Sequence, residues 1–316
     1  MGEENEDALG LHEERGAAWP QDVALGRDFN EPRTFVGAAG SRRKRAPENI
    51  RRRVIRSARL TPSVIRWTEL PATARCAPMK ATLLHSPENG TDYHLFTHAP
   101  GGRDAPLLLV LDGDDQFAAA CEALDGLRAE KALEAVTLVG VGYGGSYRSP
   151  ANRRVRDYTH SQPADEPMEA GGAETFLAFL ENTLLPHLSE RFVFPMDSVG
   201  LGGHSLGSLL GLYALAQPRT LFSRFLVSSP SIWWDNRSIL RDISAAGRAE
   251  ITPRKAFLSI GEEDTPSMLG DLELLEHQLQ REPVAGLYHV VRRFPGKDHY
   301  NVLTQAYAEG LRWLYA

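Results

Sequence analysis

A serine with a glycine two positions away on each side stands in the second half of the chain. The segment Gly203-His204-Ser205-Leu206-Gly207 fits the pattern G-x-S-x-G. In this pattern the serine occupies a tight, strained turn between a strand and a helix, where bulky flanking side chains would clash. Ser205 is therefore a candidate nucleophile, and the backbone N–H of Leu206 is a candidate donor to an oxyanion. The alternative is a glycine-rich turn that carries a surface serine.

A serine hydroxyl becomes a good nucleophile when a base accepts its proton, and histidine suits that task near neutral pH. Three histidines follow Ser205 in the chain. His277 falls within an expected helix and His289 within an expected strand. His299 falls in the segment FPGKDHYNV, in a loop between the last strand and the last helix. We predict that His299 is the general base; the alternative is a loop histidine beside a helix-capping Asp298.

An acidic residue should stand between the serine and the histidine in the chain, because this order accompanies the G-x-S-x-G turn. Such an acid holds the imidazole in the required tautomer. The segment Gly261-Glu262-Glu263-Asp264 follows an expected strand and offers three carboxylates. We predict Asp264 as the acid, with Glu263 as the alternative.

A second oxyanion donor is expected after the strand that precedes the first long helix. That loop reads Asp112-Gly113-Asp114-Asp115. The backbone N–H of Asp114 is the candidate, on the condition that its carboxylate turns away from the developing negative charge. The alternative is an ordinary Asp-Gly turn.

Strands and helices alternate from about residue 80 onwards. A hairpin is expected between residues 80–86 and 92–100, because Asn-Gly at the intervening turn favours left-handed geometry. Apolar runs predict strands and periodic segments predict helices, with a long polar loop over residues 144–172. The expected strands cover residues 106–113, 135–143, 198–203, 225–231, 255–261 and 287–294, and the expected helices cover 115–130, 174–191, 205–217, 269–280 and 301–315. This order predicts an α/β fold with a mostly parallel central sheet and helices on both faces.

Composition places this chain among ordinary globular proteins. Of its 316 residues, 42% are hydrophobic and 24% are charged, and the formal net charge is −6. That charge gives no reason to expect a nucleic-acid partner. Its two cysteines, Cys76 and Cys121, have neither metal-binding nor redox spacing. The sequence has no apolar run of membrane-spanning length and no apolar core near its start, so we expect a cytoplasmic protein.

Residues 1–75 differ in character from the rest. An acidic stretch comes first and a block rich in arginine follows, without a sustained apolar period. We predict a mobile or disordered N-terminal arm over residues 1–75 and a catalytic domain over residues 76–316. Electrostatic attachment of the arm to nucleic acid, a membrane or a partner is the less favoured alternative.

Several segments together resemble a family of esterases. They are LLLVLDGDDQF, RVRDYTH, GGHSLGSLLGLYALAQPRTLFSRFLVSSPSIWWDN and FPGKDHYNV. The best-understood branch of that family comprises the ferric-enterobactin and salmochelin esterases. The resemblance covers about residues 80–316. It implies an α/β-hydrolase fold and cleavage of ester bonds without a cofactor or metal.

The resemblance also implies roles for particular residues. Arg154, in the segment RVRDYT, would contact an anionic substrate; the alternative is a structural pair with an acidic neighbour. Trp233 and Trp234 would form an aromatic wall of the pocket, or would be core aromatics. Ser208 stands where the family often has glycine, and His160 where it often has proline.

The function expected from these features is that of a serine esterase that acts on a small-molecule ester through an acyl-enzyme. In the siderophore branch the substrate is a cyclic trilactone. The alternatives are a general carboxylesterase, a thioesterase resembling S-formylglutathione hydrolase, and a non-catalytic binding module with a hydrolase fold.

Overall fold

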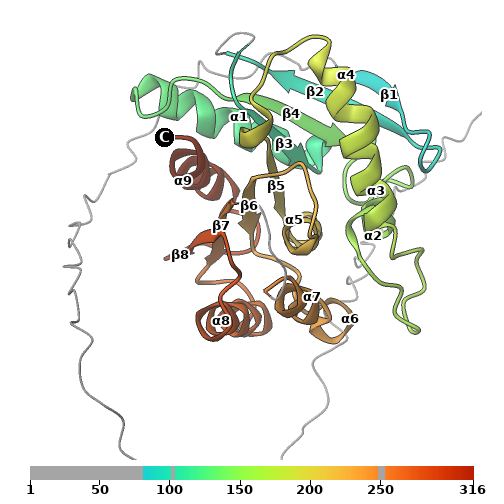
Figure 1. Cartoon of the computed structure of the whole chain (residues 1–316), viewed down its shortest axis with the longest axis vertical. Coiled ribbons are helices and arrows are strands. Elements are labelled where there is room, and N and C mark those ends of the chain that lie inside the picture. Colours follow the sequence, from blue (N-terminus) through green and yellow to red (C-terminus); the bar gives the residue numbers. More distant parts are fainter. Residues whose placement is uncertain (1–80, 101–103, 248–252) are drawn as a thin grey trace, which may run out of the picture. The chain divides into compact units, whose positions relative to one another are not determined.

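The computed structural model describes residues 81–100, 104–247 and 253–316. The predicted N-terminal arm and Cys76 lie outside these residues. The described strands form one eight-stranded sheet (Figure 1). They are β1 (Thr82–His85), β2 (Asp92–His98), β3 (Leu107–Leu111), β4 (Thr137–Gly142), β5 (Gly200–His204), β6 (Arg224–Ser228), β7 (Arg254–Gly261) and β8 (Leu287–Phe294).

The sheet is mostly parallel, as the alternation of strands and helices predicts. Its strand order is β1-β2-β4-β3-β5-β6-β7-β8. β1 pairs antiparallel with β2 across a turn in which Gly90 has a φ of 69°, so the expected hairpin is present. β2 also pairs antiparallel with β4, whereas every later pair is parallel. The carboxyl ends of the parallel strands therefore share one edge, where the loops that carry the candidate residues emerge.

Helices cover both faces of the sheet (Figure 1). The longer ones are α1 (Gly113–Ala129), α5 (Leu206–Ala216), α7 (Ile239–Ala246), α8 (Pro266–Arg281) and α9 (Leu303–Tyr315). Because side chains alternate along a strand, Leu107, Leu109 and Leu111 of β3 join one buried cluster with α5, α7 and α8. Leu108 and Val110 join the other cluster, with α1 and α9. β3 is fully buried, as its continuous apolar run predicts.

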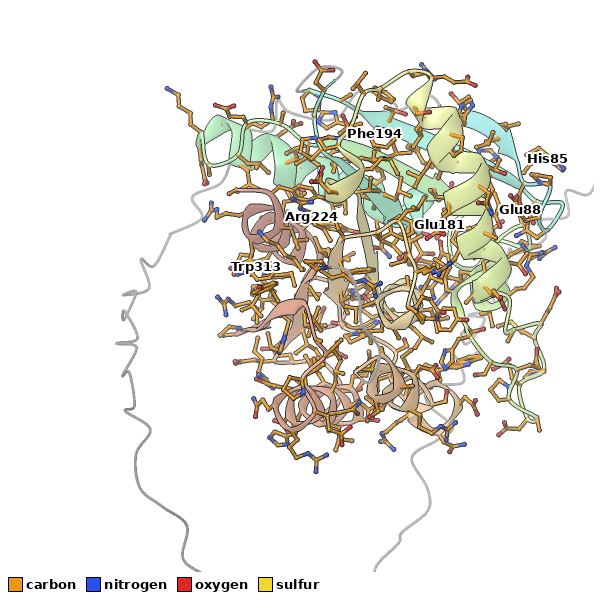
Figure 2. The ribbon with its side chains drawn as sticks, in the orientation of Figure 1. His85, Glu88, Glu181, Phe194, Arg224 and Trp313 are labelled. Carbon is orange, nitrogen blue, oxygen red and sulfur yellow. The ribbon has the colours of Figure 1, made fainter. Side chains whose placement is uncertain are left out.

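One long helical run covers the segment predicted as a helix over 174–191. It consists of α3 (Ala173–Phe179), the π-helical turn η2 (Leu180–Leu184) and α4 (Leu185–Ser189). Pro186 has no N–H to donate, and its ring crowds the preceding turn, which accounts for the widened turn before it. Glu88 and Glu181 fasten this run to its neighbours (Figure 2). Glu88 accepts a hydrogen bond from Thr183 at 2.7 Å, and Glu181 accepts one from the backbone N–H of residue 221 at 3.0 Å.

Three short helical segments depart from the predicted pattern. The segment 144–172 is not wholly irregular, because it contains α2 (Arg154–Tyr158). The expected strand 225–231 ends at residue 228, and α6 (Trp234–Arg237) and α7 follow it. A helix of four to eight residues shows one or two turns of apolar period, which is too little to recognise.

No helix within the described ranges is long and apolar enough to cross a membrane. The cytoplasmic location stays a prediction.

Candidate active site

Ser205 lies in a strained turn at the carboxyl edge of the sheet. β5 ends at His204, α5 begins at Leu206, and the backbone of Ser205 between them has φ 58° and ψ −120°. Non-glycine residues rarely adopt a positive φ, and such strain clusters at functional sites. A Cβ atom on Gly203 would lie 2.5 Å from the carbonyl carbon of Gly207, so the turn requires glycine at position 203. The turn therefore has the geometry that the G-x-S-x-G pattern predicts.

Ser208 braces the same turn from within α5. Its Oγ lies 2.7 Å from the carbonyl oxygen of Gly203 and 2.8 Å from that of Ser228, and it accepts the N–H of Ser228 at 2.7 Å. The hydroxyl thus joins the first turn of α5 to the ends of β5 and β6. This gives a structural reason for serine at a position where the family often has glycine.

His299 and Asp264 form a hydrogen-bonded pair next to the turn. His299 Nδ1 lies 2.9 Å from Asp264 Oδ2, and the Asp264 side chain is fully buried. Burial alone would raise the pKa of Asp264, but hydrogen bonds from His299 and the Thr265 N–H, with the electrostatic effect of His299, lower it overall. Glu263 is exposed. Of the two predicted acids, Asp264 is the one that contacts the imidazole.

The imidazole of His299 packs against the residue immediately before Ser205. The ring centroids of His204 and His299 lie 4.4 Å apart. Burial is the main cause that lowers the pKa of His204 well below its ordinary value, and the electrostatic effects of His299 and Arg154 add to it. His204 is therefore neutral near neutral pH. The Ser205 hydroxyl itself lies 3.2 Å from the hydroxyl of Ser231. Direct proton transfer from Ser205 to His299 Nε2 stays a prediction, although both groups lie at one edge of the sheet.

The two predicted oxyanion donors occupy the first turns of α5 and α1. Leu206 is the first residue of α5 and Asp114 the second of α1, so neither N–H has an acceptor within its own helix. The Asp114 carboxylate accepts the N–H of Tyr143 at 2.5 Å. A Cβ on Gly142 would lie 2.3 Å from Asp114 Oδ2, so the carboxylate occupies the space beside that glycine. The Asp114 carboxylate is therefore bound to the N–H of Tyr143, as is required if the backbone N–H of Asp114 is to face a developing negative charge.

Arg154 binds Asp112 instead of presenting an unpaired guanidinium. Its Nε and Nη2 lie 3.0 Å and 2.9 Å from the two carboxylate oxygens of Asp112. Burial raises the pKa of Asp112, and Arg154 opposes that shift. The guanidinium also lies 4.7 Å from the ring centroid of Tyr147. The structure thus shows the pairing that was the alternative for Arg154, and a direct substrate contact stays a prediction.

Replacing Arg154 with alanine is expected to lower the free energy of unfolding by about 3–5 kcal/mol, because it leaves a buried carboxylate without its cation. Arg154→Lys should lower the free energy of unfolding by less, because lysine keeps the positive charge. Some loss is still expected, because lysine cannot make the bidentate contact with the carboxylate. Denaturant unfolding of the two variants and the wild type measures this difference. Wild-type stability in Arg154→Ala, together with a raised KM, would instead indicate that the guanidinium serves the substrate.

The neighbouring residues of the RVRDYT segment are structural. The Asp157 carboxylate is buried and accepts hydrogen bonds from the hydroxyls of Tyr93 at 2.7 Å and Tyr143 at 3.0 Å. The Tyr158 hydroxyl accepts the N–H of Asp112 at 3.0 Å. These bonds tie α2 to β2 and to the loops after β3 and β4, which places Arg154 against the candidate oxyanion loop.

The two tryptophans differ in their surroundings. Trp234 is 3% exposed, lies within the core cluster, and donates its indole N–H to the carbonyl of Ser161 at 3.3 Å. Trp233 is partly buried and packs against that cluster. Trp234 is therefore a core aromatic, which was the alternative to a pocket wall. Trp233 is only partly buried, and its role as a pocket wall stays a prediction.

His160 connects the 144–172 segment to the start of α7. Its Nε2 lies 2.6 Å from Ser238 Oγ, and its ring stacks on Tyr213 with centroids 5.6 Å apart. A histidine in place of the family's usual proline thus serves as a packing contact.

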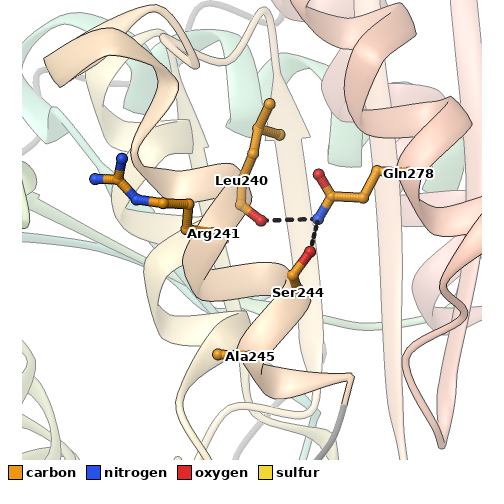
Figure 3. A pocket seen from close by; sticks show the side chains of 5 residues that line it. All are labelled: Leu240, Arg241, Ser244, Ala245 and Gln278. Carbon is orange, nitrogen blue, oxygen red and sulfur yellow. Dashed lines mark hydrogen bonds between the residues drawn. The ribbon is translucent and has the colours of Figure 1, made fainter.

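A separate hollow of about 390 Å³ lies between α7 and α8 (Figure 3). It is lined by Leu240, Arg241, Ser244, Ala245 and Gln278. Gln278 donates to the carbonyl of Leu240 at 2.8 Å and to Ser244 Oγ at 3.0 Å, so its amide joins the two helices. None of the candidate catalytic groups lines this hollow, so it is separate from the site at the sheet edge. Within the described residues, no three His, Cys, Asp or Glu side chains are arranged to hold a metal ion.

The mostly parallel sheet and the strained serine between β5 and α5 define an α/β-hydrolase fold. Over residues 86–299 the sequence matches the family described as "Putative esterase". The chain belongs to this family of esterases, which are hydrolases that act on ester bonds.

Two relatives whose names describe siderophore esterases resemble parts of this chain. The siderophore enterobactin esterase of Emericella nidulans is 36% identical over 155 residues, which are 45% of this chain and 51% of that protein. The chain thus spans about half the length of this relative. The siderophore triacetylfusarinine C esterase of Aspergillus fumigatus is 30% identical over 243 residues, which are 66% of this chain and 81% of that protein.

A solved structure agrees with the fold. The crystal structure of the BES protein from Bacillus cereus superposes with a TM-score of 0.67 at 27% identity, and covers 76% of this chain and 97% of that one.

Proposed function

We propose that this protein is a serine esterase that hydrolyses carboxylic esters through an acyl-enzyme. The observation that carries the proposal is the buried Asp264 carboxylate on His299 Nδ1, at the same sheet edge as the strained Ser205. With Nδ1 occupied, the second ring nitrogen of His299 is left to accept a proton from the serine. A non-catalytic binding module has no need for this arrangement.

The reaction proceeds in two halves. Ser205 Oγ attacks the ester carbonyl carbon while its proton passes to His299, and the N–H groups of Leu206 and Asp114 stabilise the carbonyl oxygen as it becomes negative. His299 then gives the proton to the departing alcohol, which leaves an acyl group on Ser205. Water then gives a proton to His299 and attacks the acyl carbon, and the bond to Ser205 Oγ breaks to release the acid while His299 returns the proton to Ser205.

The proposed substrate class is the ester of a siderophore, and a cyclic trilactone is the specific candidate. The names of two relatives support it, since both describe siderophore esterases. Pairing of Arg154 with Asp112 means that recognition of an anionic ligand would draw on other groups or on a rearranged pair. General carboxylesterase or thioesterase activity is the competing assignment.

Two measurements on the full chain test this proposal. A fluorophosphonate probe should label the wild-type protein, and peptide mass spectrometry should locate the label on Ser205. Turnover of ferric enterobactin should then exceed turnover of short p-nitrophenyl esters and of S-formylglutathione. Absence of labelling would remove the serine mechanism, whereas labelling with a strong preference for the small esters or the thioester would remove only the siderophore substrate.

A further inference from the structure

The backbone after β6 fastens Ser231 to the candidate nucleophile. Ser229 has a φ of 43° and donates its N–H to the carbonyl of Ser259 at 2.7 Å. Two residues later, the Ser231 N–H donates to the carbonyl of Ser205 at 3.2 Å. The left-handed residue thus turns the chain back across the end of β5 and sets Ser231 beside the turn that carries Ser205.

The side chain of Ser231 contacts Ser205, as its backbone N–H does. Its Oγ lies 3.2 Å from Ser205 Oγ, and the residue is 0% exposed. Each hydroxyl has a single proton to donate. When the Ser205 proton is directed to His299, the proton between the two serines must belong to Ser231. Within the described residues Ser205 Oγ is the hydrogen-bond partner of the Ser231 hydroxyl, so this donation is available to Ser231 at every stage.

We propose that Ser231 is a further catalytic residue, whose hydroxyl donates to Ser205 Oγ whenever that oxygen carries negative charge. This inference rests on the proposed function. During acylation the O–H bond of Ser205 breaks, its proton goes to His299, and Oγ forms the bond to the carbonyl carbon. During deacylation that bond breaks, and Oγ takes the electron pair before His299 returns the proton. Ser231 keeps its own proton in both halves.

This role differs from that of the oxyanion donors. The N–H groups of Leu206 and Asp114 would act on the carbonyl oxygen of the substrate, whereas Ser231 acts on the attacking and departing oxygen of the enzyme. A hydrogen bond to a charged oxygen is stronger than one to a neutral oxygen. Ser231 therefore stabilises the charged stages more than the resting state, which is the condition for an effect on kcat.

Ser231→Ala is expected to lower kcat by about tenfold or more with KM changed less than about twofold, and to slow fluorophosphonate labelling of Ser205 by a similar factor. The labelling rate reports on the nucleophile alone, without a substrate-binding step. Ser231→Cys, with a weaker donor of similar shape, should fall between alanine and the wild type.

Ser259→Ala is the matched control, because Ser259 is also fully buried and its hydroxyl has no partner among the described residues. It should label at the wild-type rate. A folded Ser231→Ala protein with wild-type kcat and labelling rate would overturn the inference. If that variant does not fold, an unimpaired Ser231→Cys would overturn it equally. Failure of the wild type to label would count against the proposed serine-esterase function. Normal labelling of both the wild type and Ser231→Ala would count only against the role of Ser231.

Discussion

The Ser205→Ala protein is expected to hydrolyse esters about 10⁴-fold more slowly than the wild type, or slower still. Without the hydroxyl no acyl-enzyme can form, and the remaining donors can only assist direct attack by water. The measurement is kcat for p-nitrophenyl acetate, followed to the background rate. The fold should survive, because alanine has no larger side chain to place in the strained turn and only Ser231 loses its hydroxyl partner.

Two controls make that loss interpretable. Ser267→Ala removes an exposed hydroxyl in the first turn of α8 and should keep full activity. Thermal unfolding of Ser205→Ala should show a cooperative transition near that of the wild type. Undiminished hydrolysis by the Ser205→Ala protein would exclude Ser205 as the nucleophile and leave the strained turn without a catalytic explanation.

The features predicted well from the sequence are those that local chemistry determines. The turn around Ser205 requires glycine at position 203 because a Cβ there would meet the backbone of residue 207, so the five residues from 203 to 207 are enough to predict the turn. The strand over residues 287–294 has the predicted bounds, because an alternating run ends there in a Pro-Gly turn. The parallel sheet follows from the alternation of strands and helices along the chain.

The features that the sequence did not reveal depend on contacts between distant segments. Arg154 and Asp112 are separated by 42 positions, and nothing in the local sequence of either segment identifies the other as its partner. The partial burial of Trp233 and the full burial of Trp234 depend on the turn that follows β6. The contact of Ser231 with Ser205 likewise joins residues 26 positions apart, and its one signal in the sequence is the second serine of SPSIWW.

The Asp264→Asn protein should lose about 10³- to 10⁴-fold in kcat while it retains its fold. The carboxylate accepts the Nδ1 proton of His299 and stabilises the imidazolium that forms when Ser205 attacks. An asparagine amide can present its N–H₂ group instead, which favours the tautomer with the proton on the wrong nitrogen. Measurement of kcat and KM with one p-nitrophenyl ester should place the loss in kcat.

The pH dependence and a neighbouring carboxylate distinguish this role from a structural one. The folded pKa of Asp264 is lowered, so its stabilising effect is present above the ordinary carboxyl pKa of about 3.9 and is lost as pH falls through the folded value. Asp264→Asn should therefore reduce the stability difference between neutral and strongly acidic pH. Glu263→Gln, which changes an exposed carboxylate one residue away, should leave kcat unchanged. If Glu263→Gln loses activity while Asp264→Asn keeps full activity, Glu263 is the catalytic acid. The imidazole of His299 would then have to contact Glu263 during the reaction.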